Sequence, residues 1–432
     1  MRVPSVRKVY LGMTFVALAT LFSYACAVGN GDPAASPIEE TPGVPEAGKL
    51  TGLPPSDARS DRTPNDDDGS DAQVDAGQPL DGGDAGKDAT SSLDDAGTFM
   101  VVRVGTAGGV TLSAAAAAVH LEERRFSDGV VTQTIAMRTA AAGAERPFAL
   151  RGTATTEGAL SLAGNGAYVV LAGYAAVPGT ADVAETASAS TPRVVARVTR
   201  SGAIDTSTTL DAAFDGKSVR SAASATGAAF WVAGENGANA SGGIYFIDRG
   251  TTGGTQILAA PQNLRVVGLF DGQLYASTQS GAVGNTLRLF SVGAGMPVTS
   301  GQAGAALAGT TDANTPHGFT MLDLDPAIAG VDTMYVADTR ALAGGGGIQK
   351  LKLVAGTWTL AATFKSGMTA APVNVTAKKS GASVLVVCVT LDNPAKILRF
   401  VDDGVNASPI GAVLGTGTAT SAQFRGIAVS PL

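Results

Sequence analysis

Short apolar runs recur along the chain from Thr98 to Leu432, separated by turns rich in Gly, Asp, Asn and Ser. Runs rich in β-branched and aromatic residues predict strands, and many short strands in succession predict a sandwich, a barrel or a propeller. Representative runs cover residues 99–104, 168–172, 230–233, 334–337 and 384–389. The chain beyond residue 97 is therefore expected to be all-β.

One window is ambiguous, because residues 114–118 are all alanine and are followed by Val119, His120, Leu121 and Glu122. Intrinsic propensity alone favours a helix in this window. We predict a strand over residues 119–126 instead.

A four-strand unit repeats along the chain, and internal repetition is the signature of a propeller or a solenoid. The clearest copy covers residues 317–324, 332–338, 347–353 and 358–364. The same order of strands begins again at Gly158, Val219, Leu264 and Asn374.

The two ends of the repeat region complement each other. Residues 424–430 look like a first strand without followers, whereas residues 99–104, 119–126 and 131–137 are strands that lack a first one. Joining them predicts a six-bladed β-propeller over residues 98–432, closed by the C-terminal strand in the N-terminal blade, which leaves no exposed sheet edge at the closure. Seven blades are the alternative, if residues 206–217 or 297–316 contain further strands.

The N-terminus resembles an export signal. Arg2, Arg7 and Lys8 precede an apolar run over residues 9–22, the usual order of charge and hydrophobicity in a secretory signal peptide. The run leads to Cys26 after Ala25, which resembles a bacterial lipobox, so residues 1–26 are predicted to be a signal peptide with lipidation at Cys26. The same small residues also suit ordinary signal peptidase, so free secretion and a retained anchor remain open.

Residues 27–97 contain no Phe, Trp or Tyr; they are first Pro-rich and then rich in Asp and Gly. Such a segment cannot bury enough apolar surface to fold, so we predict a disordered linker. Its acidity accounts for the negative charge of the whole chain, a formal -7. A lipid at Cys26 would tether the chain to a membrane surface, and the predicted location is the cell envelope, as an outer-membrane lipoprotein, or the extracellular space.

Composition excludes several kinds of chemistry. The chain has 2 Cys and 2 His, too few for a disulfide framework or for His-rich metal sites. No Gly-x-Ser-x-Gly elbow occurs, and the glycine-rich stretches at 211–218 and 344–347 do not fit nucleotide-binding loops. No cofactor, metal or nucleic-acid partner is expected, and Cys388, inside an apolar run, is predicted to be a buried thiol.

Tyr335-Val-Ala-Asp338 is followed by Ile348-Gln-Lys350, and Phe424-Arg-Gly-Ile-Ala-Val429 lies near the C-terminus. These phrases resemble those of NHL-repeat propellers. Residues 119–429 also resemble a recurrent set of uncharacterised bacterial secreted and lipoprotein β-propeller proteins. The resemblance implies the fold and an exported location, and it implies no activity.

A propeller places the first strand of each blade around its central channel. The polar residues that open these strands are predicted to converge on one axis, where three arginines favour a small anion, since a guanidinium presents a planar fork to carboxylate or phosphate. The alternative for these positions is ordered water and structural pairing. The six candidates are Glu157, Arg220, Arg265, His317, Asn374 and Arg425.

Three function classes follow. The favoured one is a non-catalytic binding or scaffolding module, with a small anion, a peptide or a protein at the channel. The second is a metal-dependent lactonase or hydrolase in which Glu157 and Asn374 hold a cation, although the arginines would repel it. The third is a purely structural surface protein. Catalysis is thus the less favoured outcome, and no catalytic residue is assigned.

Overall fold

The structure, a computed structural model, describes residues 97–279, 288–310 and 315–432. Within this part of the chain the regular elements are strands and three short 3-10 turns, η1 (Val183–Glu185), η2 (Ala238–Ala240) and η3 (Leu342–Gly344). None of the described residues forms a helix long and apolar enough to cross a membrane. The predicted signal peptide, Cys26 and the predicted linker up to residue 96 lie outside the described residues.

Four of the sheets in the described ranges have four antiparallel strands each, hydrogen-bonded in sequence order. The first consists of β9 (Val219–Ala223), β10 (Ala229–Gly234), β11 (Gly243–Asp248) and β12 (Thr255–Leu258). The second consists of β13 (Val267–Phe270), β14 (Gln273–Ser277), β15 (Leu289–Val292) and β16 (Gly304–Ala306). The third consists of β17 (Pro316–Leu322), β18 (Thr333–Asp338), β19 (Gly347–Val354) and β20 (Thr357–Phe364). The fourth consists of β21 (Pro372–Ser380), β22 (Ser383–Thr390), β23 (Lys396–Asp402) and β24 (Ala412–Thr416).

The remaining sheet has nine strands and contains both ends of the described chain. One part consists of β5 (Ser161–Leu162), β6 (Val169–Tyr174), β7 (Arg193–Val198) and β8 (Ile204–Leu210). The other part consists of β1 (Thr98–Gly105), β2 (Ala116–Arg125), β3 (Val131–Ala136) and β25 (Ala422–Val429). The short strand β4 (Ala149–Arg151) pairs with both β2 and β6 and so connects the two parts.

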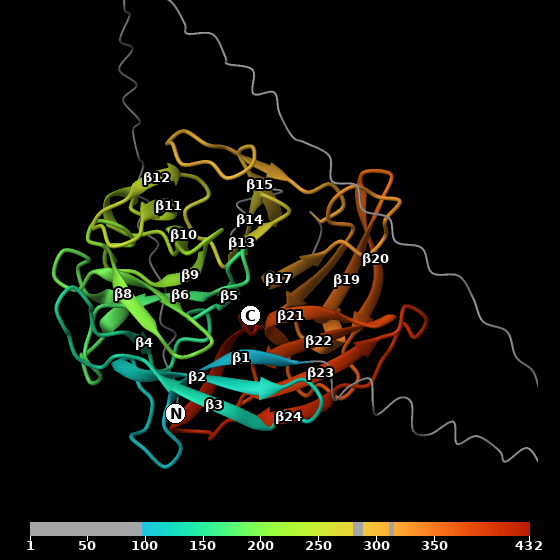
Figure 1. The fold of residues 1–432 in the computed structure, drawn as a ribbon, viewed down its shortest axis with the longest axis horizontal. Helices are drawn as coiled ribbons and strands as arrows, with labels where there is room; N and C mark the ends of the chain where they lie inside the picture. The colour runs from blue at the N-terminus through green and yellow to red at the C-terminus, as the bar shows by residue number, and fades with distance from the viewer. Residues whose placement is uncertain (1–96, 280–287, 311–314) are drawn as a thin grey trace, which may run out of the picture. The chain divides into compact units, whose positions relative to one another are not determined.

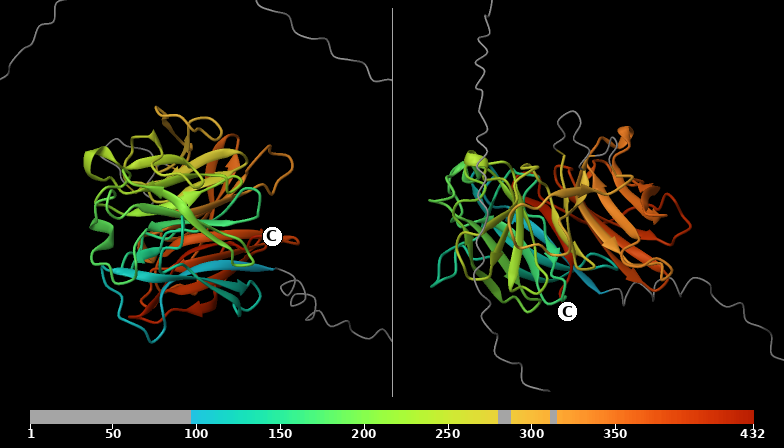
Figure 2. Two further views of the ribbon diagram at one scale, coloured as in Figure 1. Left: turned by 60° about the vertical axis from the view of Figure 1, so that its left-hand side comes forward. Right: turned by 90° about the horizontal axis from the view of Figure 1, so that it is seen from above.

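The sheets form a ring, a propeller-like arrangement in which one strand of each four-strand group lies nearest the axis (Figure 1). These inner strands touch one another in the order β5, β9, β13, β17, β21, β25 and back to β5. Figure 1 shows β5, β13, β17 and β21 near the middle and β12, β20 and β24 at the periphery. Seen from above in Figure 2, the green and the orange sheets lie on different sides of the ring.

The core lies between neighbouring sheets. Phe364 of β20 stacks on Phe400 of β23, with ring centroids 5.9 Å apart, and Phe214 meets Tyr245 of β11 edge to face at 5.4 Å. Because each sheet has a neighbour on both faces, its central strands are apolar on both faces too, as in β22, where every residue after Ser383 is buried. This explains why the strands appear in the sequence as continuous apolar runs rather than as alternating ones.

The residues that follow the alanine run form a strand, as predicted for 119–126, but the strand begins earlier, at Ala116, and so includes the last three alanines of the run. Its alanines pair with β4, with Ala116 opposite Arg151 and Ala118 opposite Ala149. Ladder pairing and burial of Val119 and Leu121 therefore outweigh the helix propensity of alanine here. The short strand β4, which completes this pairing, was not predicted.

The four strands predicted over residues 317–364 and the three predicted N-terminal strands are present in the structure, and strands follow in the predicted order from each of the other four starts, although part of the set that begins at Leu264 lies outside the described residues. The stretch at residues 206–217 supplies the second half of β8, and residues 297–316 contain β16 and the first residue of β17, although 311–314 lie outside the described ranges.

The C-terminal strand β25 pairs with the N-terminal strand β1 in antiparallel fashion, with Phe99 opposite Val429 and Gly105 opposite Ala422. Phe424 of β25 is 3% exposed and packs in one cluster with Phe99, Phe126 and Ile427. The two termini of the domain are thus joined both by backbone hydrogen bonds and by a shared apolar cluster.

Replacing Phe424 by alanine should therefore lower the free energy of unfolding by about 3–5 kcal/mol, through lost burial and the cavity left behind. Urea denaturation of the variant measures this loss. Val405→Ala, at a side chain that is 89% exposed, is the matched control and should change stability by less than about 0.5 kcal/mol. Equal stability of the two variants would contradict the role assigned to β25.

Candidate functional site

The six predicted candidate residues lie at the start of the six inner strands. Four of them belong to β9, β17, β21 and β25, whereas Glu157 and Arg265 come just before β5 and β13. Arg265 is half-buried and the other five are almost completely buried. Their exposed fractions are 1% for Glu157, 4% for Arg220, 1% for His317, 4% for Asn374 and 5% for Arg425.

Glu157 is held by internal donors. Tyr174 on β6 donates its hydroxyl hydrogen to Oε1 at 2.7 Å, and the backbone N–H of Arg151 on β4 donates to Oε2 at 3.0 Å. Burial raises the pKa of this carboxyl, and the hydrogen bonds from Tyr174 and Arg151 oppose that rise only in part. Both carboxylate oxygens are therefore occupied within the protein.

Arg220 is fixed at one end of the ring by backbone and side-chain acceptors. Its Nη1 donates to the side chain of Asn263 and, at 2.8 Å, to the carbonyl of Leu264. Its Nη2 forms an ion pair with Glu235 at 3.3 Å. Burial, followed by the positive charge of Arg265, lowers the pKa of Arg220 to about 10, so that it stays protonated at neutral pH.

Arg265 differs from Arg220, because its guanidinium makes no hydrogen bond or ion pair with any described residue. Burial lowers its pKa, and the charge of Glu235 opposes that shift. Its backbone is anchored all the same, since its N–H donates to the carbonyl of Ser277 at 2.9 Å. The charge of Arg265 is thus positioned without being neutralised by a partner of its own.

His317 is as deeply buried as Glu157, with 1% of its surface exposed. Neither Nδ1 nor Nε2 makes a well-aligned hydrogen bond with a described residue, and the backbone of Val373 lies next to the ring. Burial, with the charges of Arg265 and Arg220, holds the pKa of His317 well below its ordinary value. The imidazole is therefore neutral at pH 7 and next to two cations.

Asn374 and Arg425 form the other half of the group. Asn374 Nδ2 donates to the carbonyl of Arg425 at 3.4 Å. The Arg425 guanidinium donates to the carbonyls of Phe424 and Gly152, at 3.1 and 3.0 Å, while its Nε has no partner among the described residues. Burial lowers the pKa of Arg425 to about 10, and the charge of Glu157 opposes this.

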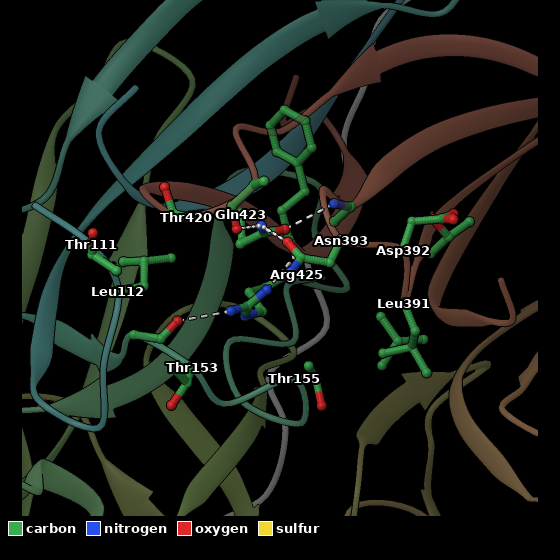
Figure 3. A pocket seen from close by; sticks show the side chains of 16 residues that line it. Thr111, Leu112, Thr153, Thr155, Leu391, Asp392, Asn393, Thr420, Gln423 and Arg425 are labelled. Carbon is green, nitrogen blue, oxygen red and sulfur yellow. Dashed lines mark hydrogen bonds between the residues drawn. The ribbon is translucent and has the colours of Figure 1, made fainter. Parts of the chain in front are cut away.

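Arg425 faces a pocket of about 350 Å³ between the loops that precede and follow the inner strands (Figure 3). Its lining is mixed, with threonines and the carboxylate of Asp392 beside apolar side chains such as Leu112 and Leu391. Figure 3 shows the guanidinium between Thr153 and Thr155 on one side and Gln423 and Asn393 on the other. The pocket offers one guanidinium and one carboxylate, together with hydroxyl and amide groups, to a small polar ligand.

A second cavity, of about 270 Å³, lies between the inner strands β5, β13, β17, β21 and β25 themselves. Its lining is mainly apolar and includes Leu160, Val267, Phe319, Val375 and Ile427. These residues follow the polar candidates by one to three positions along each strand. The channel is therefore charged at one end and apolar farther along.

The structure thus brings the candidates into two coupled groups. His317, Arg220 and Arg265 interact electrostatically with one another, and Asn374 is bonded to Arg425. Glu157 interacts with both groups, through the charges of Arg220 and Arg425. Whether these residues bind a ligand stays a prediction.

Several residues that shape the site were not predicted. Tyr174 and Glu235 hold Glu157 and Arg220, and Arg193, 0% exposed, lies over the Tyr174 ring at 5.2 Å. Arg193 donates to the carbonyls of Thr191, Ala184 and Lys217. No sequence pattern distinguishes these residues, because their partners lie on other strands.

Side chains of the types that ligate metals, and the thiol of Cys388, also occur in the described part of the chain. The described residues contain no group of three or more His, Cys, Asp and Glu arranged to hold a metal ion. Cys388 is 0% exposed, as predicted, and burial raises the pKa of its thiol to about 12. The thiol is therefore protonated and unreactive at neutral pH.

No protein-family model matches the chain, and no curated protein matches it significantly. The NHL-like character therefore stays a prediction.

Solved structures show distant similarity. TolB from Acinetobacter baumannii is 10% identical over 78% of this chain and 67% of that chain, with a TM-score of 0.40. AztD from Citrobacter koseri is 10% identical over 77% of this chain and 97% of that chain, with a TM-score of 0.33. Both are too distant to transfer an activity, and the propeller-like fold is assigned from the sheets themselves.

The buried neutral imidazole predicts a pH dependence of stability. In the unfolded chain His317 takes up a proton below pH ~6.5, whereas in the folded protein it does so only at lower pH. The unfolded state therefore binds more protons, and stability should fall as pH drops below ~6.5, by at most about 1.4 kcal/mol per pH unit.

Urea denaturation at pH 7.5 and 5.5 measures this effect. His317→Gln should lose less stability on acidification than the parent protein. His120→Gln is the control, and its effect should be smaller because His120 is only partly buried. An acid sensitivity unchanged in His317→Gln would show that the folded histidine titrates normally.

Proposed function

We propose that the protein is an exported, lipid-anchored cell-envelope module that binds a ligand at the charged end of its ring and does not transform it. The proposal rests mainly on one observation. Arg220, Arg265 and Arg425 gather at the same end of the inner strands, and Glu235 is the only described carboxylate in an ion pair with any of them. A group of guanidiniums with so little internal neutralisation suits an anionic partner.

The domain, residues 98–432, is proposed to be a six-bladed propeller. Division of the nine-stranded sheet at β4 gives two groups of four strands beside the four smaller sheets. The cyclic contacts of the six inner strands support the same count. The seven-bladed alternative is less favoured, because the stretches that could supply a further blade contribute β8 and β16 to the existing sheets.

The proposed cellular location of the protein is inferred from its N-terminal sequence. A signal peptide over residues 1–26, a lipid at Cys26 and a linker over 27–97 would hold the domain away from a membrane surface. The proposed location is the cell envelope, as an outer-membrane lipoprotein, with release to the outside as the alternative.

The ligand is proposed to be a small anion, or a peptide or protein that presents a carboxylate. Arg425 offers a guanidinium to the pocket of about 350 Å³, and Arg265 offers one that is half-buried and unpaired among the described residues. Nucleic acid is not a favoured partner, since the net negative charge lies in residues 27–97 and the remaining domain is close to neutral rather than basic.

The metal-dependent lactonase or hydrolase alternative is weaker. Glu157 would have to supply a ligand oxygen, yet both of its oxygens accept hydrogen bonds from Tyr174 and Arg151, and burial favours its protonated form. The charges of Arg220 and Arg425 next to it would also oppose a cation. A purely structural surface protein remains the third candidate.

A thermal-shift panel tests the binding proposal. Sulfate, phosphate, citrate and short peptides with a free carboxyl end are added to the purified protein, and a ligand that binds only the folded state raises the melting temperature. At 100 times its Kd such a ligand adds about 2.7 kcal/mol of stability. Arg265→Gln and Arg425→Gln should reduce the shift, because each removes a guanidinium from the site.

Arg249→Gln, which changes an exposed arginine paired with Asp205, is the control and should retain the full shift. If no anion or peptide stabilises the parent protein, the binding proposal is wrong. A purely structural surface protein then becomes the favoured alternative. Stabilisation by a divalent cation that is lost in Glu157→Gln would instead favour the hydrolase.

The anchor is tested separately. Because only the cysteine can carry the lipid, Cys26→Ala should move the protein from the membrane fraction to the soluble fraction or the medium, as seen by immunoblotting of fractions. Cys388→Ala, which removes the buried thiol, should leave the fractionation unchanged. A membrane-bound Cys26→Ala protein would contradict lipidation at this residue.

A further inference from the structure

His317, Arg220 and Arg265 are contributed by three neighbouring inner strands or their first residues. Arg220 lies on β9, Arg265 just before β13 and His317 on β17, and these strands touch in that order. The three side chains come from distant parts of the sequence, so their meeting is a property of the ring rather than of a local motif.

Short hydrogen bonds connect the three positions. Arg220 Nη1 donates to the carbonyl of Leu264, the residue before Arg265. Ser277 accepts the backbone N–H of Arg265 through its carbonyl, while its hydroxyl donates to the carbonyl of His317 at 2.6 Å. The backbone at all three positions is thereby fixed relative to the others, and the cluster is preorganised.

The imidazole of His317 is 1% exposed, and neither ring nitrogen makes a well-aligned hydrogen bond with a described residue, although the backbone of Val373 lies next to the ring. A buried polar group without a full hydrogen bond costs stability. The Nε atoms of Arg220 and Arg265 lack partners among the described residues in the same part of the structure. These incompletely bonded nitrogens on three converging side chains therefore point to a ligand that brings acceptor oxygens.

Charge selects the kind of ligand. The charged groups that face His317 are Arg220 from β9 and Arg265 from the start of β13, and the β21 side contributes the backbone of Val373. Glu235, after β10, pairs with Arg220 and interacts with Arg265. Two guanidiniums and one carboxylate leave a net positive charge, and half-buried Arg265 gives access from solvent.

We infer that His317, Arg220 and Arg265 form a site for a small oxyanion, such as sulfate or phosphate, and that His317 takes up one proton from solvent when the anion binds. The inference rests on the proposed binding function and specifies its ligand and its regulation. The proton adds to the free ring nitrogen, so both imidazole nitrogens become donors, and the doubly charged anion together with the Glu235 carboxylate balances the charges of all three side chains.

The direction of the pH effect follows from linkage. In the free protein His317 is neutral, because burial and the two arginines disfavour its charged form. An anion next to the ring favours the charged form and raises the pKa of His317. Affinity should therefore rise as pH falls between the bound-state and free-state pKa values, by up to about tenfold per pH unit, and should level off outside that window.

Sulfate is the probe, because its own charge does not change between pH 6 and pH 8. Isothermal titration of the purified protein at pH 6, 7 and 8, at constant ionic strength and in two buffers of different ionisation enthalpy, gives both the affinity and the number of protons taken up. The chain has 2 His, so His120→Gln is a complete matched control for His317→Gln.

We expect sulfate to bind several-fold more tightly at pH 6 than at pH 8, with uptake of up to one proton, in the parent and in His120→Gln. His317→Gln should lose the proton uptake and the pH dependence, and Arg265→Gln should weaken sulfate at every pH. Sulfate affinity independent of pH in the parent, or a pH dependence that persists in His317→Gln, would overturn the inference.

The parent protein gives a second measurement that needs no stable variant. Proton–nitrogen NMR of the two imidazoles follows their titration with and without sulfate, and sulfate should raise the pKa of His317 and leave that of His120 unchanged. Equal pKa values of His317 with and without sulfate would refute the proton uptake.

Failure of this inference can be separated from failure of the proposed function. If sulfate does not bind but another anion or a peptide stabilises the protein through Arg425, the oxyanion site is wrong and the binding module stands. If no member of the panel binds at any pH, both are wrong.

Discussion

Face-to-face packing of sheets that are apolar on both sides is the constraint on which the rest of this structure depends. A strand such as β22, buried along almost its whole length, cannot belong to a sheet with one face in water. Each sheet therefore needs two neighbours, and a ring supplies them to every sheet. The aromatic contacts of Phe364 with Phe400 and of Phe270 with Phe319 lie at such sheet-to-sheet contacts.

The same packing crowds the inner strands against one another. A Cβ on Gly426 would lie 2.1 Å from the carbonyl oxygen of Gly158, and a Cβ on Gly318 would lie 2.6 Å from Oδ1 of Asn374. Only glycine fits at these two positions, because any side chain would push neighbouring inner strands apart. Close approach of the backbones in turn brings the polar residues next to these glycines into one small region.

The electrostatics of that region follow from its burial. Arg220 and Arg425 donate hydrogen bonds to backbone carbonyls, and among the described residues only Arg220 of the two has a carboxylate in an ion pair. Their charges therefore act over short distances on whatever lies between them. Burial raises the pKa of Glu157 and lowers the pKa of His317, and the charges of Arg265 and Arg220 lower the pKa of His317 further.

The sequence by itself determined the all-β class, the four-strand repeat, the buried thiol of Cys388 and the polar residue at the start of each inner strand, because these depend on local pattern and spacing. It could not show the strand β4 or the hydrogen bond from Tyr174 to Glu157. Nor could it show that Arg220 forms an ion pair with Glu235 whereas Arg265 forms none with a described residue. Those features depend on which strands become neighbours, and only packing of the sheets decides that. The charge state of His317 was decided there too, since its burial and its two cationic neighbours come from three separate strands.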